Sequence, residues 1–298
     1  MTSPNPPKPP TPPWRRTALR VVRFALLLYL AWGVTLFFLQ PKLLYLPALA
    51  GRGADEAEIA GLEKRDGLVR HWIERDGARV EAWLLPSKQP TARGLVAITH
   101  GNAELIDHLL EDAGEWRRMG FDVLLAEYRG YGRSTGSPSQ EAIVGDTLAA
   151  IDWALAKTAR RTLVLHGRSL GTGVAMQVAA RLGEIQAPHA LALAVLEAPF
   201  TSIASYAPQY GLPQFIVRDP YRTDEVLPTL ACPVLILHTR GDEVVPIAHG
   251  EALASLAPTR IDLVEFDGTH NSGISMTRAY WEAVDNAVGK ALPPDAVD

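Results

Sequence analysis

The sequence contains one cysteine, Cys232, among its 298 residues. A single thiol excludes an internal disulfide and any metal site built from several thiolates, and its place at the entry to an apolar run makes packing its expected role. The chain also lacks an H-E-x-x-H pattern and a calcium-binding loop pattern, so we expect no metal and no cofactor. Basic residues are not in excess, because 29 lysines and arginines face 33 aspartates and glutamates. We therefore expect no nucleic-acid partner.

Phosphate-binding loops are absent too, although one stretch comes close to them. Residues 163–180, LVLHGRSLGTGVAMQVAA, place a glycine-rich turn between an apolar run and a helical pattern. A P-loop needs a lysine after its last glycine, and none follows here. A dinucleotide-binding loop needs G-x-G-x-x-G, but the third glycine position after Gly171 and Gly173 is Met176. Both kinds of nucleotide site are excluded.

The same turn contains the pattern G-x-S-x-G, formed by Gly167, Ser169 and Gly171. Small residues on either side allow a serine to occupy a strained turn between a strand and a helix, where its hydroxyl is exposed. We therefore predict that Ser169 is a catalytic nucleophile. The alternative is a serine that only caps the helix beginning near Leu170.

A serine nucleophile needs a base that takes its proton and an acid that orients the base. For a serine on such a turn, the acid and then the histidine follow along the chain. His270, after the apolar run 261–266, is the predicted base. Asp242, after the run 233–240, is the predicted acid, and Glu197 is the alternative because it also ends an apolar run.

The negatively charged oxygen of a tetrahedral intermediate needs two N–H donors. The backbone N–H of Leu170, directly after the predicted nucleophile, is the first. The second is predicted in the loop HGNAE, residues 100–104, where Gly101 permits a tight turn and Asn102 presents its backbone N–H. The alternative for this loop is a plain glycine turn.

The N-terminal 40 residues have a composition of their own. We predict that the proline-rich residues 1–16 form a disordered tail and that residues 17–40 form a membrane anchor or signal sequence. The uncharged run 24–39 would span about 24 Å as a helix, against a hydrocarbon core of about 30 Å. The arginines before it predict a single-pass protein with a cytoplasmic N-terminus and a catalytic domain on the outer, periplasmic or extracytoplasmic side. The alternative is a signal peptide cleaved near residues 48–50.

The rest of the chain alternates short apolar runs with helical patterns. Strands are expected in two runs around the turn Asp76-Gly77 and then at 94–100, 122–128, 162–168, 191–199, 233–240 and 261–266. Buried strands joined by helices predict an α/β protein with a mostly parallel central sheet flanked by helices. We expect a juxtamembrane linker over 41–66, a catalytic domain over 67–292 and a C-terminal tail over 293–298.

One interval breaks this alternation. Residues 200–230 contain four prolines and more apolar side chains than a solvent-exposed loop should carry. We predict a short cap insertion over the nucleophile, with Tyr206, Phe215 and Ile216 binding an acyl chain. The alternative is that these side chains only seal the cap to the domain.

The chain resembles the α/β-hydrolase superfamily through the motifs GLVAITHGNAE, LLAEYRGYGRSTGSPSQEA, LVLHGRSLGTGVA, LEAPFTS, PVLILHTRGDEVVPIAHGEAL and GTHNS. From about residue 43 to its end it is similar to a membrane-anchored branch related to serine aminopeptidases and protein depalmitoylases. The resemblance implies an α/β-hydrolase fold, a catalytic triad of Ser169, Asp242 and His270, and oxyanion donors at Asn102 and Leu170. Members of the branch vary at the position of Arg168. That side chain either favours anionic substrates or points to solvent.

Three hypotheses for function follow. The first is a membrane-tethered serine hydrolase that cleaves a carboxylic ester or thioester of an acylated or other small-molecule substrate. The second is a peptidase or amidase with the same triad. The third is a non-catalytic scaffold of this fold, which an intact triad argues against.

Overall fold

The computed structural model describes residues 13–184 and 190–292. Residues 1–12 of the predicted proline-rich tail, and the whole predicted C-terminal tail, lie outside the described residues. The chain divides into two compact units, residues 1–40 and 41–298, and each is described by itself.

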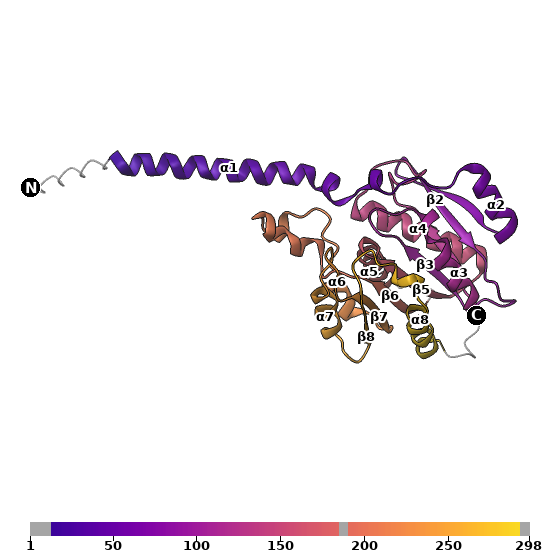
Figure 1. Cartoon of the computed structure of the whole chain (residues 1–298). Coiled ribbons are helices and arrows are strands. Elements are labelled where there is room, and N and C mark those ends of the chain that lie inside the picture. The colour runs from indigo at the N-terminus through magenta and orange to yellow at the C-terminus, as the bar shows by residue number, and fades with distance from the viewer. Residues whose placement is uncertain (1–12, 185–189, 293–298) are drawn as a thin grey trace, which may run out of the picture. The chain divides into compact units, whose positions relative to one another are not determined.

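The first unit contains most of helix α1 (Pro13–Leu44), the long indigo helix of Figure 1. The helix has 32 residues, and its most apolar 18-residue window has a mean hydropathy of 2.0 and is 11% buried. It begins at Pro13, ahead of the anchor boundary expected at residue 17, because proline is tolerated in the first turn of a helix. By its length and composition, this helix can cross a membrane.

An eight-stranded sheet forms the centre of the second unit, in the order β1-β2-β4-β3-β5-β6-β7-β8. Its strands are β1 (Val69–Arg75), β2 (Ala78–Leu85), β3 (Leu95–Thr99), β4 (Asp122–Ala126), β5 (Thr162–Arg168), β6 (Ala190–Glu197), β7 (Val234–Thr239) and β8 (Ile261–Phe266). The pairs β1–β2 and β2–β4 are antiparallel, and the others are parallel. The predicted hairpin is confirmed, since Arg75 pairs with Ala78 across Asp76 and Gly77, which both have a positive φ.

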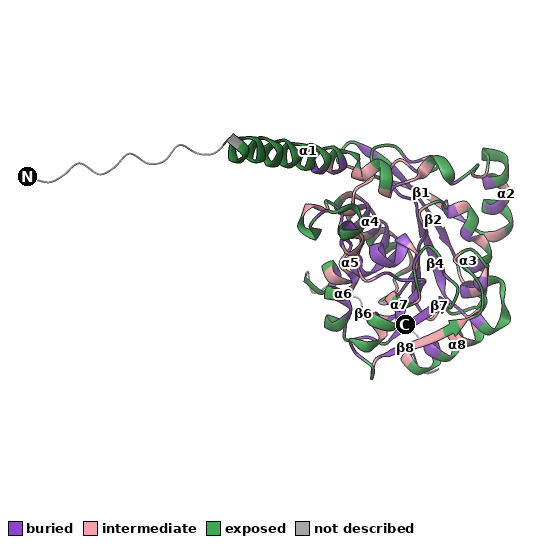
Figure 2. Cartoon of the chain, turned by 60° about the vertical axis from the view of Figure 1, so that its left-hand side comes forward, coloured by how far each residue is buried: buried purple, intermediate pink, exposed green. Residues whose placement is uncertain are grey.

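Helices cover both faces of this sheet, as the sequence predicts (Figure 2). They are α2 (Glu56–Asp66), α3 (Leu110–Arg118), α4 (Gln140–Thr158), α5 (Leu170–Glu184), α6 (Thr223–Val226), α7 (Ala248–Ser255) and α8 (Arg278–Ala291). Apolar side chains of α4, α5 and α7 form one core, and those of α2, α3 and α8 form the other. Strand residues alternate between them: Ile236 of β7 belongs to the first core, whereas Leu235 and Leu237 belong to the second.

The predicted insertion after β6 consists of short helical segments. These are η3 (Ile203–Tyr210), η4 (Gln214–Ile216), α6 and η5 (Leu227–Thr229). Phe200 and Tyr221 are buried against Gly173 of α5, where a Cβ would lie 2.7 Å from the Phe200 ring and 3.0 Å from Tyr221. The insertion therefore packs on the helix that follows the predicted nucleophile.

Candidate active site

Ser169 lies on the turn between β5 and α5, with a φ of 49°. A left-handed conformation is costly for a residue with a side chain and persists only where the surroundings impose it. The two glycines of the G-x-S-x-G pattern provide those surroundings. A Cβ on Gly171 would overlap the carbonyl oxygen of Thr99, and one on Gly167 would lie 2.6 Å from the Gly171 oxygen. Close backbone packing thus explains why glycine stands on both sides of the serine.

A chain of hydrogen bonds joins Ser169, His270 and Asp242. The Ser169 Oγ lies 3.1 Å from Nε2 of His270, and the opposite ring nitrogen, Nδ1, lies 2.7 Å from Oδ2 of Asp242. Backbone N–H groups of Val244 and Val245 donate to Oδ1 of Asp242 at 2.9 and 2.7 Å. The three side chains come from the segments after β5, β7 and β8, because the carboxyl ends of parallel strands meet at one edge of the sheet.

Glu197, the alternative acid, makes different contacts. Its Oε2 accepts from the Tyr280 hydroxyl at 2.9 Å and lies 3.2 Å from Nε of Arg168. The structure therefore brings Asp242, and not Glu197, to the imidazole of His270.

The loop after β3 lies directly beside the serine. A Cβ on Gly101 would be 3.7 Å from the Cβ of Ser169. The Gly101 N–H donates to Oε2 of Glu104 at 2.6 Å, which fixes the turn. Asn102 follows this glycine, and Leu170 occupies the first position of α5, where a helical N–H has no acceptor within its own helix. Their roles as oxyanion donors stay predictions.

Arg168 forms a half-buried ion cluster that sequence reasoning missed. Its guanidinium contacts the carboxylates of Glu104, Asp112 and Glu197 and donates to Ser275 Oγ at 2.9 Å. Burial opposes the charged form, but the three carboxylates outweigh it and raise the pKa of Arg168 well above its ordinary value. The side chain thus does not point to solvent, and three carboxylates surround its charge. It connects the loop after β3, through Glu104, to the segment that follows His270.

His100 also supports this loop. Its Nε2 lies 2.7 Å from Oε1 of Glu127, and its Nδ1 lies 2.7 Å from the carbonyl oxygen of Gly101. Burial alone would lower the pKa of His100, but the Glu127 carboxylate outweighs it and raises the pKa. Both ring nitrogens face acceptors, which suits an imidazolium that donates from each of them.

His166 is buried in its neutral form behind the site. Its Nδ1 accepts from Trp116 Nε1 at 3.0 Å, and its Nε2 lies 2.9 Å from the Tyr280 hydroxyl. Burial, with a smaller contribution from Arg168, lowers the pKa of His166 to about 3. This imidazole therefore stabilises the fold only while it is uncharged.

We expect this histidine to make the fold acid-sensitive. In the unfolded chain His166 binds a proton below about pH 6.5, whereas in the folded chain it binds one only near pH 3. The stabilisation is complete above about pH 6.5 and is lost toward pH 3, at about 1.4 kcal/mol per pH unit. In His166→Gln, the change in unfolding free energy between pH 7 and pH 5 should shrink by about 2 kcal/mol, measured by denaturant titration. The exposed Ser255→Ala is the matched control; an unaltered pH dependence in His166→Gln would contradict the assignment.

The three cap residues predicted to bind substrate differ in their surroundings. Tyr206 stacks on His249 with ring centroids 5.3 Å apart, and burial together with nearby Asp242 raises its pKa to about 12. Its hydroxyl is buried and has no hydrogen-bond partner among the residues that the structure describes. Phe215 is 86% exposed, so its ring lies in solvent and not in an enclosed pocket. Ile216 is half-buried.

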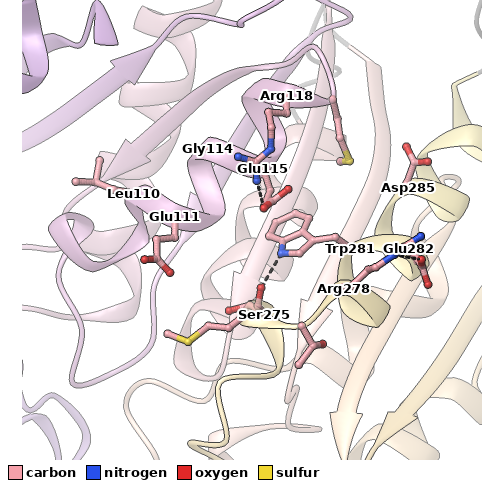
Figure 3. A pocket seen from close by; sticks show the side chains of 13 residues that line it. Leu110, Glu111, Gly114, Glu115, Arg118, Ser275, Arg278, Trp281, Glu282 and Asp285 are labelled. Atoms are coloured by element: carbon pink, nitrogen blue, oxygen red, sulfur yellow. Dashed lines mark hydrogen bonds and ion pairs between the residues drawn. The ribbon is translucent and has the colours of Figure 1, made fainter. Parts of the chain in front are cut away.

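A groove of about 1010 Å³ lies between α3 and α8 (Figure 3). Its lining includes four carboxylates and two guanidinium groups but none of Ser169, Asp242 or His270. Such a polar lining does not suit an acyl chain, so volume alone does not identify the substrate site. Within residues 13–184 and 190–292, no group of three or more His, Cys, Asp or Glu side chains could hold a metal ion.

Comparison with known proteins finds that the chain is similar to hydrolases. The sequence model of the family described as "Serine aminopeptidase, S33" matches residues 90–223. The chain is 34% identical over 187 residues to the lysophosphatidylserine lipase ABHD12 of Macaca fascicularis, covering 56% of this chain and 46% of that protein. It is 30% identical over 232 residues to the protein YfhR of Escherichia coli, covering 74% and 80%. The chain spans about half the length of the lipases that it matches.

Among solved structures, the esterase Pf2001 of Pyrococcus furiosus has a TM-score of 0.64 to this chain. Sequence identity is 15%, and the likeness covers 81% of this chain and 96% of the esterase. At that identity the likeness shows the fold alone, and the fold agrees with the one that the sequence predicts.

Proposed function

The chain belongs to the α/β-hydrolase superfamily, and from this premise we propose that it is a serine hydrolase that cleaves carboxylic esters or thioesters through an acyl-enzyme on Ser169. The observation that carries the proposal is the hydrogen-bonded chain from Ser169 through His270 to Asp242, on a strained turn at the carboxyl edge of the sheet. Rapid labelling of Ser169 by a fluorophosphonate probe tests it, since a non-catalytic scaffold would not react.

The geometry supports a two-step reaction. Ser169 Oγ attacks the substrate carbonyl while Nε2 of His270 takes the hydroxyl proton. Asp242 holds the Nδ1–H and stabilises the imidazolium, and the N–H groups of Asn102 and Leu170 bind the oxyanion. The imidazolium then protonates the leaving alcohol or thiol. A water molecule, deprotonated by His270, hydrolyses the acyl-enzyme and restores the serine.

A lipid ester is the substrate class that we propose. Relatives at 34% identity carry the name lysophosphatidylserine lipase. Lysophosphatidylserine is a lipid with an acyl ester. The apolar helix α1 would tether the domain to a bilayer, where such substrates concentrate. The arginines before it favour a cytoplasmic N-terminus and a catalytic domain on the outer side.

Activity should depend on the length of the acyl chain. Each buried methylene contributes about 0.8 kcal/mol, or about fourfold in kcat/KM, until the acyl site is filled. We therefore expect kcat/KM to rise along a series of p-nitrophenyl esters from acetate to laurate. Phe215→Ala and Ile216→Ala test the cap, because removing a side chain that lines the acyl chain should reduce the preference for laurate. A maximum at acetate, unchanged in both variants, would contradict a lipid substrate.

Amide hydrolysis is the second candidate, because the matching family is described by a serine aminopeptidase. An amine leaves only after protonation, so His270 would have to act as a well-placed general acid. Comparing p-nitrophenyl esters with aminoacyl anilides decides between the two, and faster anilide cleavage would favour the peptidase.

A further inference from the structure

The segment that ends helix α1 is hydrogen-bonded to the loop after β3. Asn102 Nδ2 donates to the carbonyl oxygen of Leu44 at 2.5 Å, and the Leu46 N–H donates to Asn102 Oδ1 at 2.9 Å. The Tyr131 hydroxyl donates to the same Oδ1 at 2.7 Å and lies 3.0 Å from the Leu46 nitrogen. One carboxamide thus holds the main chain of two residues in the segment, which we call the strap (residues 44–46).

We propose that the strap is part of the catalytic machinery and that the Asn102 side chain is a positioning group. By binding the strap, it places the backbone N–H of the same residue for the oxyanion. The inference rests on the proposed function, in which that N–H is the second oxyanion donor.

The strap is a rigid support because its central residue belongs to the core. Tyr45 is 3% exposed, packs in the core on the α4 and α5 side of the sheet, and lies with its hydroxyl 3.0 Å from that of Tyr221. Tyr221 is itself fully buried, and its backbone N–H donates to Gln140 at 2.7 Å. The Asn102 carboxamide, which is bonded to the main chain of Leu44 and Leu46 on either side of Tyr45, is therefore held to the body of the domain.

The two halves of the loop have separate supports. Glu104 and His100 fix the peptide groups of Gly101; His100 belongs to a buried ion pair and Glu104 to a half-buried one. Asn102, one residue further on, is held through its side chain by the strap and Tyr131. Because Gly101 packs beside Ser169, the position of the next N–H relative to the reacting carbonyl depends on the strap.

Asn102→Ala separates the two roles of this residue, because alanine keeps the backbone N–H and removes the bonds to the strap. In the full-length chain in detergent micelles, we expect kcat for a p-nitrophenyl ester to fall about 10- to 100-fold, less than the ~10²–10³ for complete loss of a donor. KM should change little. The inhibition constant of a trifluoromethyl ketone, whose adduct carries an oxyanion, should rise by the same factor as kcat falls.

Tyr131→Phe removes the hydroxyl that shares Oδ1 and should lower kcat to a smaller extent. Combined with Asn102→Ala it should add little, because both groups act through one set of hydrogen bonds. Asn286→Ala, an exposed asparagine on α8, is the matched control. Thermal melting of every variant identifies any that is poorly folded at the assay temperature.

Wild-type kcat and ketone affinity in a folded Asn102→Ala protein would overturn the proposal, even if its melting temperature were lower. Losses of kcat that multiply in the Asn102→Ala/Tyr131→Phe double variant would overturn it as well. Failure of the proposed function has a different signature, since the wild type would then show no ester turnover or Ser169→Ala would retain it, whatever Asn102→Ala does.

Discussion

Replacing Ser169 by alanine should lower kcat for a p-nitrophenyl ester by about 10⁶, and His270→Ala should do so by a similar factor. The double variant should be little worse than either single one. Oγ of the serine is 3.1 Å from Nε2 of the histidine, and neither group transfers a proton without the other. Turnover by the purified full-length proteins is the measurement.

The exposed Ser255→Ala controls for handling of a protein with a long apolar helix and should match the wild type. Loss of fluorophosphonate labelling in Ser169→Ala would show that the probe reacts at this residue. Turnover that survives Ser169→Ala would place the nucleophile elsewhere. Losses that multiply in the double variant would mean that the serine and histidine act independently.

Asp242→Asn should lower kcat by about 10⁴ without disturbing the fold. Two backbone N–H groups hold Oδ1 of Asp242, so the amide nitrogen of asparagine would have to face His270. An amide N–H donating to Nδ1 stabilises the tautomer with its proton on Nε2, and that tautomer cannot accept a proton from Ser169.

Glu197→Gln is the informative comparison. Its carboxylate contacts Tyr280 and Arg168 and does not contact His270, so a smaller loss of kcat is expected. Full activity in Asp242→Asn together with an inactive Glu197→Gln would reverse the assignment of the acid.

Strands were the most predictable part of the fold. The runs at 162–168 and 261–266 agree with β5 and β8. Strand β5 is buried and parallel and carries a continuous apolar run, whereas β8 is the edge strand and is only partly buried. The run at 122–128 was predicted too long, since β4 ends at Ala126. Beyond it, Glu127 accepts from His100, and the hydroxyl of Tyr128 donates to the carbonyl oxygen of His100. These contacts depend on a loop that lies almost 30 residues earlier.

The same limit applies to the site. Ser169, Asp242 and His270 could be found because each follows a strand whose carboxyl end lies at one edge of the sheet. The partners of Arg168 could not, since Glu104, Asp112 and Ser275 are 56 to 107 positions away and no local pattern marks them. The side-chain contacts of Asn102 were also missed, because the glycine before it indicates only a tight backbone turn.

The strap bears on whether the domain could be separated from its proposed membrane anchor, helix α1. A peptidase that cut after Ala50 would remove Tyr45 from the core, along with the main-chain groups of Leu44 and Leu46 that hold Asn102. The released domain would lose the support of its proposed second oxyanion donor, so detachment and inactivation would be a single event. The catalytic machinery itself would then confine turnover to the membrane, since any freed copy would be a poor catalyst in the surrounding medium.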